Sequence, residues 1–334
     1  MIENGEKYDL LKLVLSIFIV VLHSQILPYK FVPILRIAVP IFFIMSSFFF
    51  FKKYDNLKNN FERKKAVRHF TKRNLKLYSF WFIILLPISL LTKDWFSRGI
   101  IYGFVKIGHS IFCGSTFAAS WFITALIIAV VSICYLTRKI SNTTLLIISL
   151  FIYAFCLFDT TYYYLFEQFH IFRIIRDSYH NIFGVPYTSF PIALFWVSIG
   201  KFIADNKKHI KLSILYGLLF TSCIAFIFEE YIITSYHLAI DNDCYISFII
   251  LCPTLFLVFS RYMIPVPKPL LLRKASTIIY CSHLSFLNLL NMAERYYMVP
   301  PPKCNFAIII LFEMILVTLI IIFSKKIPLL KYSY

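Results

Sequence analysis

The chain has 334 residues, of which 60% are hydrophobic and 15% are charged. Soluble domains are usually about 45–50% apolar and about 25% charged, so this composition excludes an ordinary soluble domain and indicates an integral membrane protein. The net charge of +18 does not indicate a nucleic-acid-binding protein. Lys and Arg gather in alternate gaps between apolar segments, as the positive-inside rule requires.

Along the chain, apolar segments recur that are long enough to cross a bilayer as helices of about 17–25 residues. They lie at 9–28, 31–51, 74–92, 119–137, 143–158, 185–204, 212–228, 244–262, 275–293 and 304–324. An N-terminus in the cytoplasm places the basic 52–73 gap and the tail with Lys325 and Lys326 on the cytoplasmic side. We predict an all-α integral membrane protein, a single bundle of about ten transmembrane helices over residues 1–334, with both termini cytoplasmic.

The first span contains His23 within an otherwise apolar run. An ionisable side chain inside a membrane helix indicates a functional site, and an imidazole can exchange a proton near pH 7. The alternative is a histidine that only bonds a nearby backbone carbonyl. A second imidazole, His283, lies in the ninth span, and two such residues favour a shared polar cavity.

Arg36 lies near the outer end of the second span, and His23 lies in the outer half of the first. The short connection through Pro28 and Pro33 makes these spans antiparallel neighbours, so the two side chains can approach each other. The alternative is an arginine that extends to the lipid headgroups. Trp121 opens the fourth span and fits either the wall of a pocket or an anchor at the membrane boundary.

The basic gap before the third span ends in Arg68, Arg73 and Lys76. Arg73 and Lys76 are three residues apart and share a helix face at the mouth of that span. An arginine fork and a lysine point charge can hold a phosphate group, which favours an anionic cofactor that arrives from the cytosol. The alternative is a loop that only sets topology and attracts anionic lipid.

Two gaps predicted to lie outside, 159–183 and 229–243, are rich in Tyr, His and acidic residues. The tyrosines fit an aromatic belt at the membrane boundary. Alternatively, they form a platform on which sugar rings stack while carboxylates accept hydrogen bonds from hydroxyls. The eight cysteines are scattered, and their spacing indicates neither a disulfide framework nor a metal site.

Short motifs occur in a recognisable order along the chain. They are Asp9-Leu-Leu-Lys12 before His23, Val39-Pro40-Ile-Phe-Phe-Ile-Met-Ser46-Ser47, Lys72-Arg73-Asn-Leu-Lys76, Trp121-Phe122-Ile-Thr-Ala125-Leu126, Pro191 to Gly200, and Ile279-Tyr280-Cys-Ser-His283. This ordered set resembles acyltransferase family 3, the multi-span bacterial O-acyltransferases that act on surface glycans. There are two departures from the family pattern. Lys76 replaces an arginine, and Ser47 replaces a glycine, which puts a close helix approach at Ser47 in doubt.

The resemblance implies a membrane-bound O-acyltransferase of the bacterial plasma (inner) membrane. It would move an acyl group, commonly acetyl, from cytosolic acyl-CoA to a hydroxyl of a cell-surface or lipid-linked glycan. His23 is then the general base or the acyl carrier, and Arg36 stabilises the oxyanion or orients the imidazole.

The CoA phosphates are expected at Arg68, Arg73 and Lys76, and the acceptor at Trp121, His283 and the aromatic outer loops. The expected partners are the glycan and membrane lipids, with no metal and no nucleic acid. The rival interpretation is a transporter or flippase for a lipid-linked glycan or small metabolite, without covalent chemistry. Such proteins show paired, Gly- or Pro-broken helices in corresponding halves, a pattern missing from this chain with its eight glycines.

Overall fold

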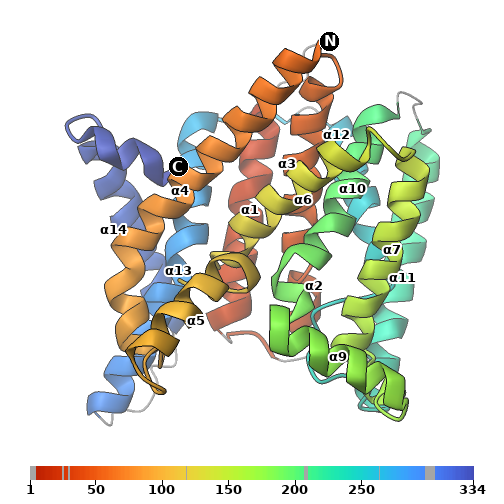
Figure 1. Ribbon diagram of the computed structural model, residues 1–334. Coiled ribbons are helices and arrows are strands. Elements are labelled where there is room, and N and C mark those ends of the chain that lie inside the picture. Colours follow the sequence, from red (N-terminus) through yellow and green to blue (C-terminus); the bar gives the residue numbers. More distant parts are fainter. Residues whose placement is uncertain are drawn as a thin grey trace. The chain divides into compact units, whose positions relative to one another are not determined.

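The computed structural model describes residues 5–24, 26–28, 31–117, 119–206, 210–262, 264–297 and 305–334, and these are helical with short connections (Figure 1). The main helices are α1 (Glu6–Ser24), α3 (Ala38–Tyr54), α4 (Asn60–Thr92), α5 (Ile100–Cys113), α6 (Trp121–Leu136), α7 (Asn142–Asp159), α9 (His170–Phe183), α10 (Phe190–Asp205), α11 (Leu212–Ser235), α12 (Phe248–Arg261), α13 (Pro269–Tyr297) and α14 (Asn305–Phe323). The short elements are α2 (Val32–Leu35), α8 (Tyr163–Phe166), and the 3-10 turns η2 (Pro186–Thr188) and η3 (Pro328–Ser333).

Several helices have the length and apolar composition that a bilayer requires. Within the described ranges there are five such helices: Val32–Tyr54, Asn60–Thr92, Asn142–Asp159, Leu212–Ser235 and Phe306–Phe323. The pair His170–Thr188 and Phe190–Asp205, bent by 43°, makes a sixth if it is one span, and three shorter apolar helices accompany them. Each predicted span overlaps a helix, although residue 25 of the first span and residue 304 of the last lie outside the described residues. The prediction of an all-helical, multi-span membrane bundle is confirmed.

The helix boundaries differ from the predicted ones where charged residues occur. Helix α4 begins at Asn60, so most of the basic 52–73 gap is helical. The outer gap 159–183 folds into α8 and α9, and α11 continues to Ser235. The prediction that residues 159–183 and 229–243 are loops is therefore partly wrong. Charge marks the edge of a membrane, but Lys, Arg and Glu are good helix formers and do not end a helix.

The second predicted span is broken at Arg36, between α2 and α3. Pro40 lies in the first turn of α3, and proline has no N–H to donate to the carbonyl four residues earlier. That carbonyl belongs to Arg36, so a regular α-helix cannot run through this position. Arg36 therefore lies where the regular helical hydrogen bonding is interrupted, within the apolar helical segment Val32–Tyr54.

Backbone contacts divide the chain into two compact units that interleave in sequence. Unit 1 comprises Met1–Ala38, Arg73–Ile123 and Met263–Tyr334, and unit 2 comprises Val39–Lys72 and Thr124–Tyr262. Unit 1 therefore joins the first and last helices of the chain. That residues 1–334 form one domain stays a prediction.

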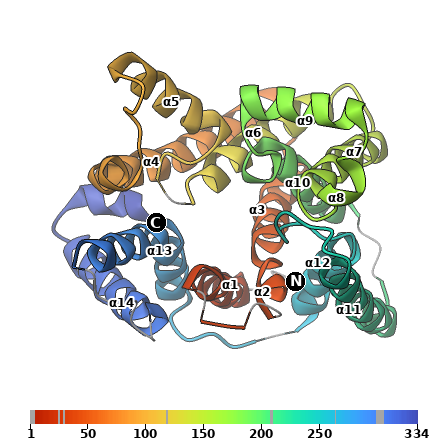
Figure 2. The same ribbon diagram turned by 90° about the horizontal axis from the view of Figure 1, so that it is seen from below.

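In unit 1, α1 packs along α13 in a parallel arrangement (Figures 1 and 2). Asp9 near the start of α1 bonds Arg273 near the start of α13, and His23 near the end of α1 stacks on His283. Lys274 donates to the Tyr334 hydroxyl at 3.2 Å, so the C-terminus lies at the end where both helices begin. Which membrane side this end faces stays a prediction.

In unit 2, α3 and α10 approach closely at Gly200. A Cβ at this position would overlap the Ser47 hydroxyl and lie 2.6 Å from the Ile44 carbonyl oxygen. Ser47 is fully buried and bonds the Phe43 carbonyl at 2.7 Å. The doubt about close packing at Ser47 is therefore wrong. Gly200 on the partner helix provides the space, as small residues do in membrane helix pairs.

This packing predicts that Gly200→Ala destabilises the protein by about 1–3 kcal/mol, the usual effect of overpacking. The matched control is Gly217→Ala in α11, where an added Cβ meets nothing within 4 Å. Alanine has a higher helix propensity than glycine, so Gly217→Ala should leave the free energy of unfolding unchanged or raise it by about 1 kcal/mol. Thermal unfolding of both purified variants measures the difference, and equal midpoints would contradict the close approach.

Candidate active site

His23 and His283 stack on each other within unit 1. His23 is half-buried in the last turn of α1, and His283 in α13 has 1% of its surface exposed. Their ring centroids are 5.5 Å apart, and their planes are inclined by 29°. The two intramembrane imidazoles thus meet at one place, although they lie at opposite ends of the sequence.

The backbone of α13 fixes the tautomer of His283. Nδ1 lies 3.0 Å from the Ile279 carbonyl oxygen and 2.9 Å from that of Tyr280. Carbonyl oxygens only accept, so Nδ1 carries the hydrogen and Nε2 of the neutral ring has the lone pair. Nε2 is buried and has no partner among the described residues. A buried acceptor without a donor costs about 1–3 kcal/mol, so this nitrogen is suited to a hydroxyl that arrives with a ligand.

Arg36 lies close enough to His23 for its charge to act on the imidazole. Arg36 lies between α2 and α3, and α2 contacts α1. The expected proximity of a guanidinium and an imidazole is therefore present in unit 1. A catalytic role for either residue stays a prediction.

A series of aromatic rings connects His283 with Trp121. The centroid distances are 6.2 Å from His283 to Tyr280, 5.4 Å from Tyr280 to Phe122, and 6.4 Å from Phe122 to Trp121. The Tyr280 hydroxyl donates to the Ala119 carbonyl at 3.3 Å, which ties α13 to the start of α6. Trp121 therefore lies two rings away from the imidazole pair rather than against it.

Cations gather at the opposite end of α1. Arg273 donates to both carboxylate oxygens of the buried Asp9, at 2.8 Å each, and Lys12 Nζ is 3.6 Å from Asp9 Oδ1. Arg73 is exposed, and its charge is close enough to repel those of Lys12 and Arg273. One carboxylate compensates only part of this charge, so the cluster of Lys12, Arg73 and Arg273 stays positive. We call it the basic cluster.

The other predicted donor residues differ in their surroundings. Lys76 is exposed, and its Nζ lies 4.6 Å from the centroid of the Tyr332 ring. Arg68 is exposed on the part of α4 that belongs to unit 2. Near the basic end, burial raises the pKa of the Tyr334 phenol, but hydrogen bonds with Ser324 and Lys274 outweigh burial and lower it.

Two residues of unit 1 are not among the predicted site residues. Arg273 opens the ninth span, where a basic residue also fits simple topology, so its type alone does not reveal a site. Glu313 gave a clearer signal, because a lone acid in the middle of an apolar span indicates function. It lies at the centre of α14 with 0% of its surface exposed.

The hydrogen bonds of Ser282 favour a protonated Glu313 carboxyl group. Its carboxyl oxygens lie 2.9 and 2.7 Å from the Ser282 hydroxyl, and this hydroxyl lies 2.7 Å from the Ile278 carbonyl oxygen. A hydroxyl has one hydrogen, so a Ser282 that donates to Ile278 must accept from a protonated Glu313. A neutral acid avoids the large penalty of a buried charge.

A family model described as an acyltransferase domain matches residues 6–325. Neither a curated protein nor a solved structure matches the chain. The family match covers nearly the whole sequence, and it favours an enzyme that uses an acyl donor over a transporter or flippase without covalent chemistry. Together with its apolar spanning helices, this match identifies the chain as a member of acyltransferase family 3 and a multi-pass membrane acyltransferase.

Proposed function

We propose that this acyltransferase is a bacterial inner-membrane O-acetyltransferase that uses cytosolic acetyl-CoA. Its acceptor is a hydroxyl of a cell-surface or lipid-linked glycan. The observation that supports this most strongly is the pair of stacked imidazoles, one with a fixed lone pair at Nε2, on the same two helices that carry Lys12 and Arg273 of the basic cluster.

The basic cluster suits the donor. Acyl-CoA has several phosphate groups at one end and a neutral thioester at the other. Arginine forks bind phosphate with two parallel hydrogen bonds, and Arg73 is exposed where Lys12 and Arg273 add to its positive charge. Asp9 and His23 stand about 21 Å apart along the axis of α1, at ~1.5 Å per residue. An extended donor arm would span this distance and bring the thioester to the imidazoles.

The imidazole pair suits the transfer step. An imidazole takes the proton of the acceptor hydroxyl while the hydroxyl oxygen attacks the acyl carbonyl carbon. Arg36 stabilises the tetrahedral oxyanion. Collapse forms the ester and breaks the carbon–sulfur bond, and the CoA thiolate takes the proton back from the imidazolium.

A two-step route uses the same residues. His23 attacks the thioester, forms an acyl-imidazole and releases the CoA thiol. The acceptor hydroxyl then attacks this acyl group while His283 Nε2, which has the lone pair, accepts its proton. The bond between the acyl carbon and the His23 nitrogen breaks, and His23 takes that proton from the His283 imidazolium. Both routes keep the reacting groups inside the membrane, where water competes less as an acceptor.

The first prediction concerns His23. His23→Gln keeps hydrogen bonding and a similar volume but cannot accept a proton near pH 7. Glycan acetylation should therefore fall by about 10²-fold or more, as far as with His23→Ala. Mass spectrometry of surface glycans from cells that express each variant measures this, with protein amount checked by immunoblot. Near-normal acetylation by a well-expressed His23→Gln protein would rule out both routes through this imidazole.

The second prediction concerns the donor. Arg73→Ala should raise the acetyl-CoA concentration needed for half-maximal rate, because loss of a charge-assisted phosphate contact costs about 1.5–3 kcal/mol. Lys64→Ala is the control, since it removes an exposed charge from the same helix. Rates in isolated membranes at varied acetyl-CoA distinguish the two variants. Equal, small effects would mean that the basic residues only set topology.

The third prediction concerns membrane orientation. Tags inserted at Asn59 and after Tyr334 should both report the cytoplasm, and a tag near Tyr163 should report the outside. This follows because a cytosolic donor requires the basic cluster to face the cytosol. Cysteine accessibility or reporter fusions measure each position. A cytoplasmic result at Tyr163 would contradict an outside acceptor.

A further inference from the structure

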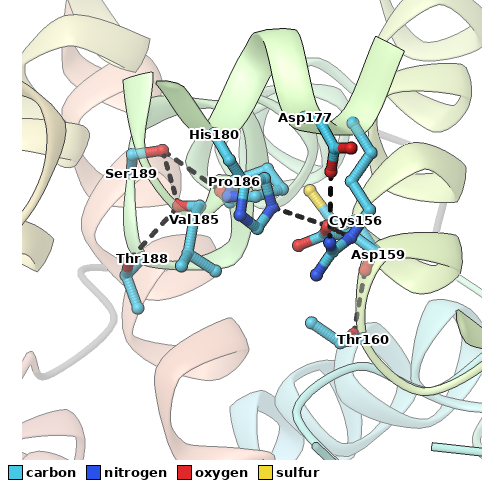
Figure 3. Close-up of polar contacts among 10 residues, drawn as sticks. Cys156, Asp159, Thr160, Asp177, His180, Val185, Pro186, Thr188 and Ser189 are labelled. Carbon is cyan, nitrogen blue, oxygen red and sulfur yellow. Dashed lines mark hydrogen bonds and ion pairs between the residues drawn. The ribbon is translucent and has the colours of Figure 1, made fainter. Parts of the chain in front are cut away.

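A carboxylate, a guanidinium and an imidazole meet where α7 ends against α9 in unit 2 (Figure 3). Asp159, the last residue of α7, has 2% of its surface exposed. Its Oδ1 accepts from Arg176 Nε at 2.8 Å and lies 2.7 Å from His180 Nε2. Because a carboxylate only accepts, Nε2 carries the hydrogen and Nδ1 of neutral His180 keeps a lone pair.

Helix α9 presents these two residues on one face. Arg176 and His180 are four residues apart and lie on the same side of the helix as the buried Phe172. The opposite side exposes four isoleucines: Ile171, Ile174, Ile175 and Ile182. Helix α9 is therefore amphipathic, the pattern of helices that lie in a membrane interface with the apolar face in lipid.

The second carboxylate oxygen of Asp159 has no donor. Arg176 and His180 both contact Oδ1, whereas an arginine usually engages both oxygens. Oδ2 is buried and has no hydrogen-bond partner among the described residues. The anchoring of α9 on α7 accounts for Oδ1 alone. It does not account for an open acceptor, which is unfavourable when buried.

Apart from the anchoring of α9, the position of Asp159 at the end of α7 does not favour a carboxylate. A helix C-terminus carries partial negative charge, which disfavours an acidic residue there. Arg176 also stacks on the Tyr163 ring, with its guanidinium carbon 4.6 Å from the centroid. The side chains of Arg176 and His180 are 19% and 23% exposed, so the cluster borders solvent. A ligand that arrives there contacts the partly exposed Arg176 and His180 first, with the buried Asp159 carboxylate directly behind them.

These groups define the chemistry of the ligand. A cation would be repelled by Arg176, and an anion would be repelled by the open Oδ2. A neutral hydroxyl can donate to Oδ2, and a second hydroxyl can donate to Nδ1 of His180. We propose that Asp159, Arg176 and His180 form a binding site for a neutral sugar ring of the acceptor glycan, with a sugar hydroxyl bonded to Asp159 Oδ2. The assignment of this sugar to the acceptor rests on the proposed function.

The variant Asp159→Asn tests Oδ2 separately from the anchoring of α9. Its amide oxygen still accepts from Arg176 and His180, while an NH2 group replaces Oδ2 and donates instead of accepting. Asp177→Asn is the matched control. Asp177 is exposed on α9, and its Oδ1 lies 3.6 Å from Nη1 of Arg176. It is not part of the proposed site.

Binding is measured on the full-length protein in lipid nanodiscs, so that no sugar-based detergent competes. The probes are galactose, mannose, rhamnose and N-acetylglucosamine, with sorbitol as a polyol that has no ring, and the readout is the thermal unfolding midpoint. At least one sugar should raise the midpoint of the wild type and of Asp177→Asn. Asp159→Asn should need about tenfold more of that sugar, or show no shift. A shift retained in Asp159→Asn, or no shift in the wild type, overturns the proposal.

A second readout does not depend on any variant. Diethyl pyrocarbonate modifies accessible imidazoles, and mass spectrometry measures the modified fraction at His180. The bound sugar should slow modification of His180 and leave the exposed His237 unchanged. Equal modification of His180 with and without sugar overturns the proposal, even when Asp159→Asn does not fold.

Acyl transfer on the same preparations separates this proposal from the proposed function. Sugar binding without any transfer from acetyl-CoA to a glycan would contradict the function and leave the sugar site standing. Transfer by Asp159→Asn with the wild-type dependence on glycan concentration would contradict the site and leave the function standing.

Discussion

The parallel contact between α1 and α13 is the interaction on which unit 1 depends. At one end Asp9 is held by Arg273 with two hydrogen bonds, and at the other His23 stacks on His283. Asp9 is 1% exposed, and a buried carboxylate needs hydrogen-bond donors to offset the cost of its desolvation. The ion pair therefore sets the register of the two helices. The register in turn brings the imidazoles together.

The polar groups of unit 1 avoid the free-energy cost of an unsolvated polar group in a membrane in different ways. The exposed cations Arg73, within α4, and Arg273, near the start of α13, lie where solvent can reach them. Glu313, at the centre of α14, instead bonds the Ser282 hydroxyl, and this bonding favours the neutral carboxyl group. His283 uses one nitrogen to bond its own helix and keeps the other open. The two nitrogens of this ring thus differ, because Nδ1 is bonded to the backbone and Nε2 is not bonded among the described residues.

Residue type and spacing predicted the membrane class, most spans and the meeting of the two imidazoles. Hydropathy works well because an apolar helix must satisfy its backbone internally in lipid. It failed for α9, since an amphipathic helix at the boundary is polar enough to look like a loop. Arg273 was missed for a related reason, because its pairing with Asp9 joins segments that no local pattern connects. The space at Gly200 became apparent only when α3 and α10 were seen together.

The contact between the first and the penultimate long helix also affects how the protein is made. Asp9 and Arg273 are 264 positions apart in the chain, so α1 enters the bilayer long before its partner is synthesised. During that interval the Asp9 carboxylate lacks the guanidinium that later compensates it. Contacts between distant segments form late and slowly. A partly synthesised chain therefore contains His23 long before His283 is available to stack on it.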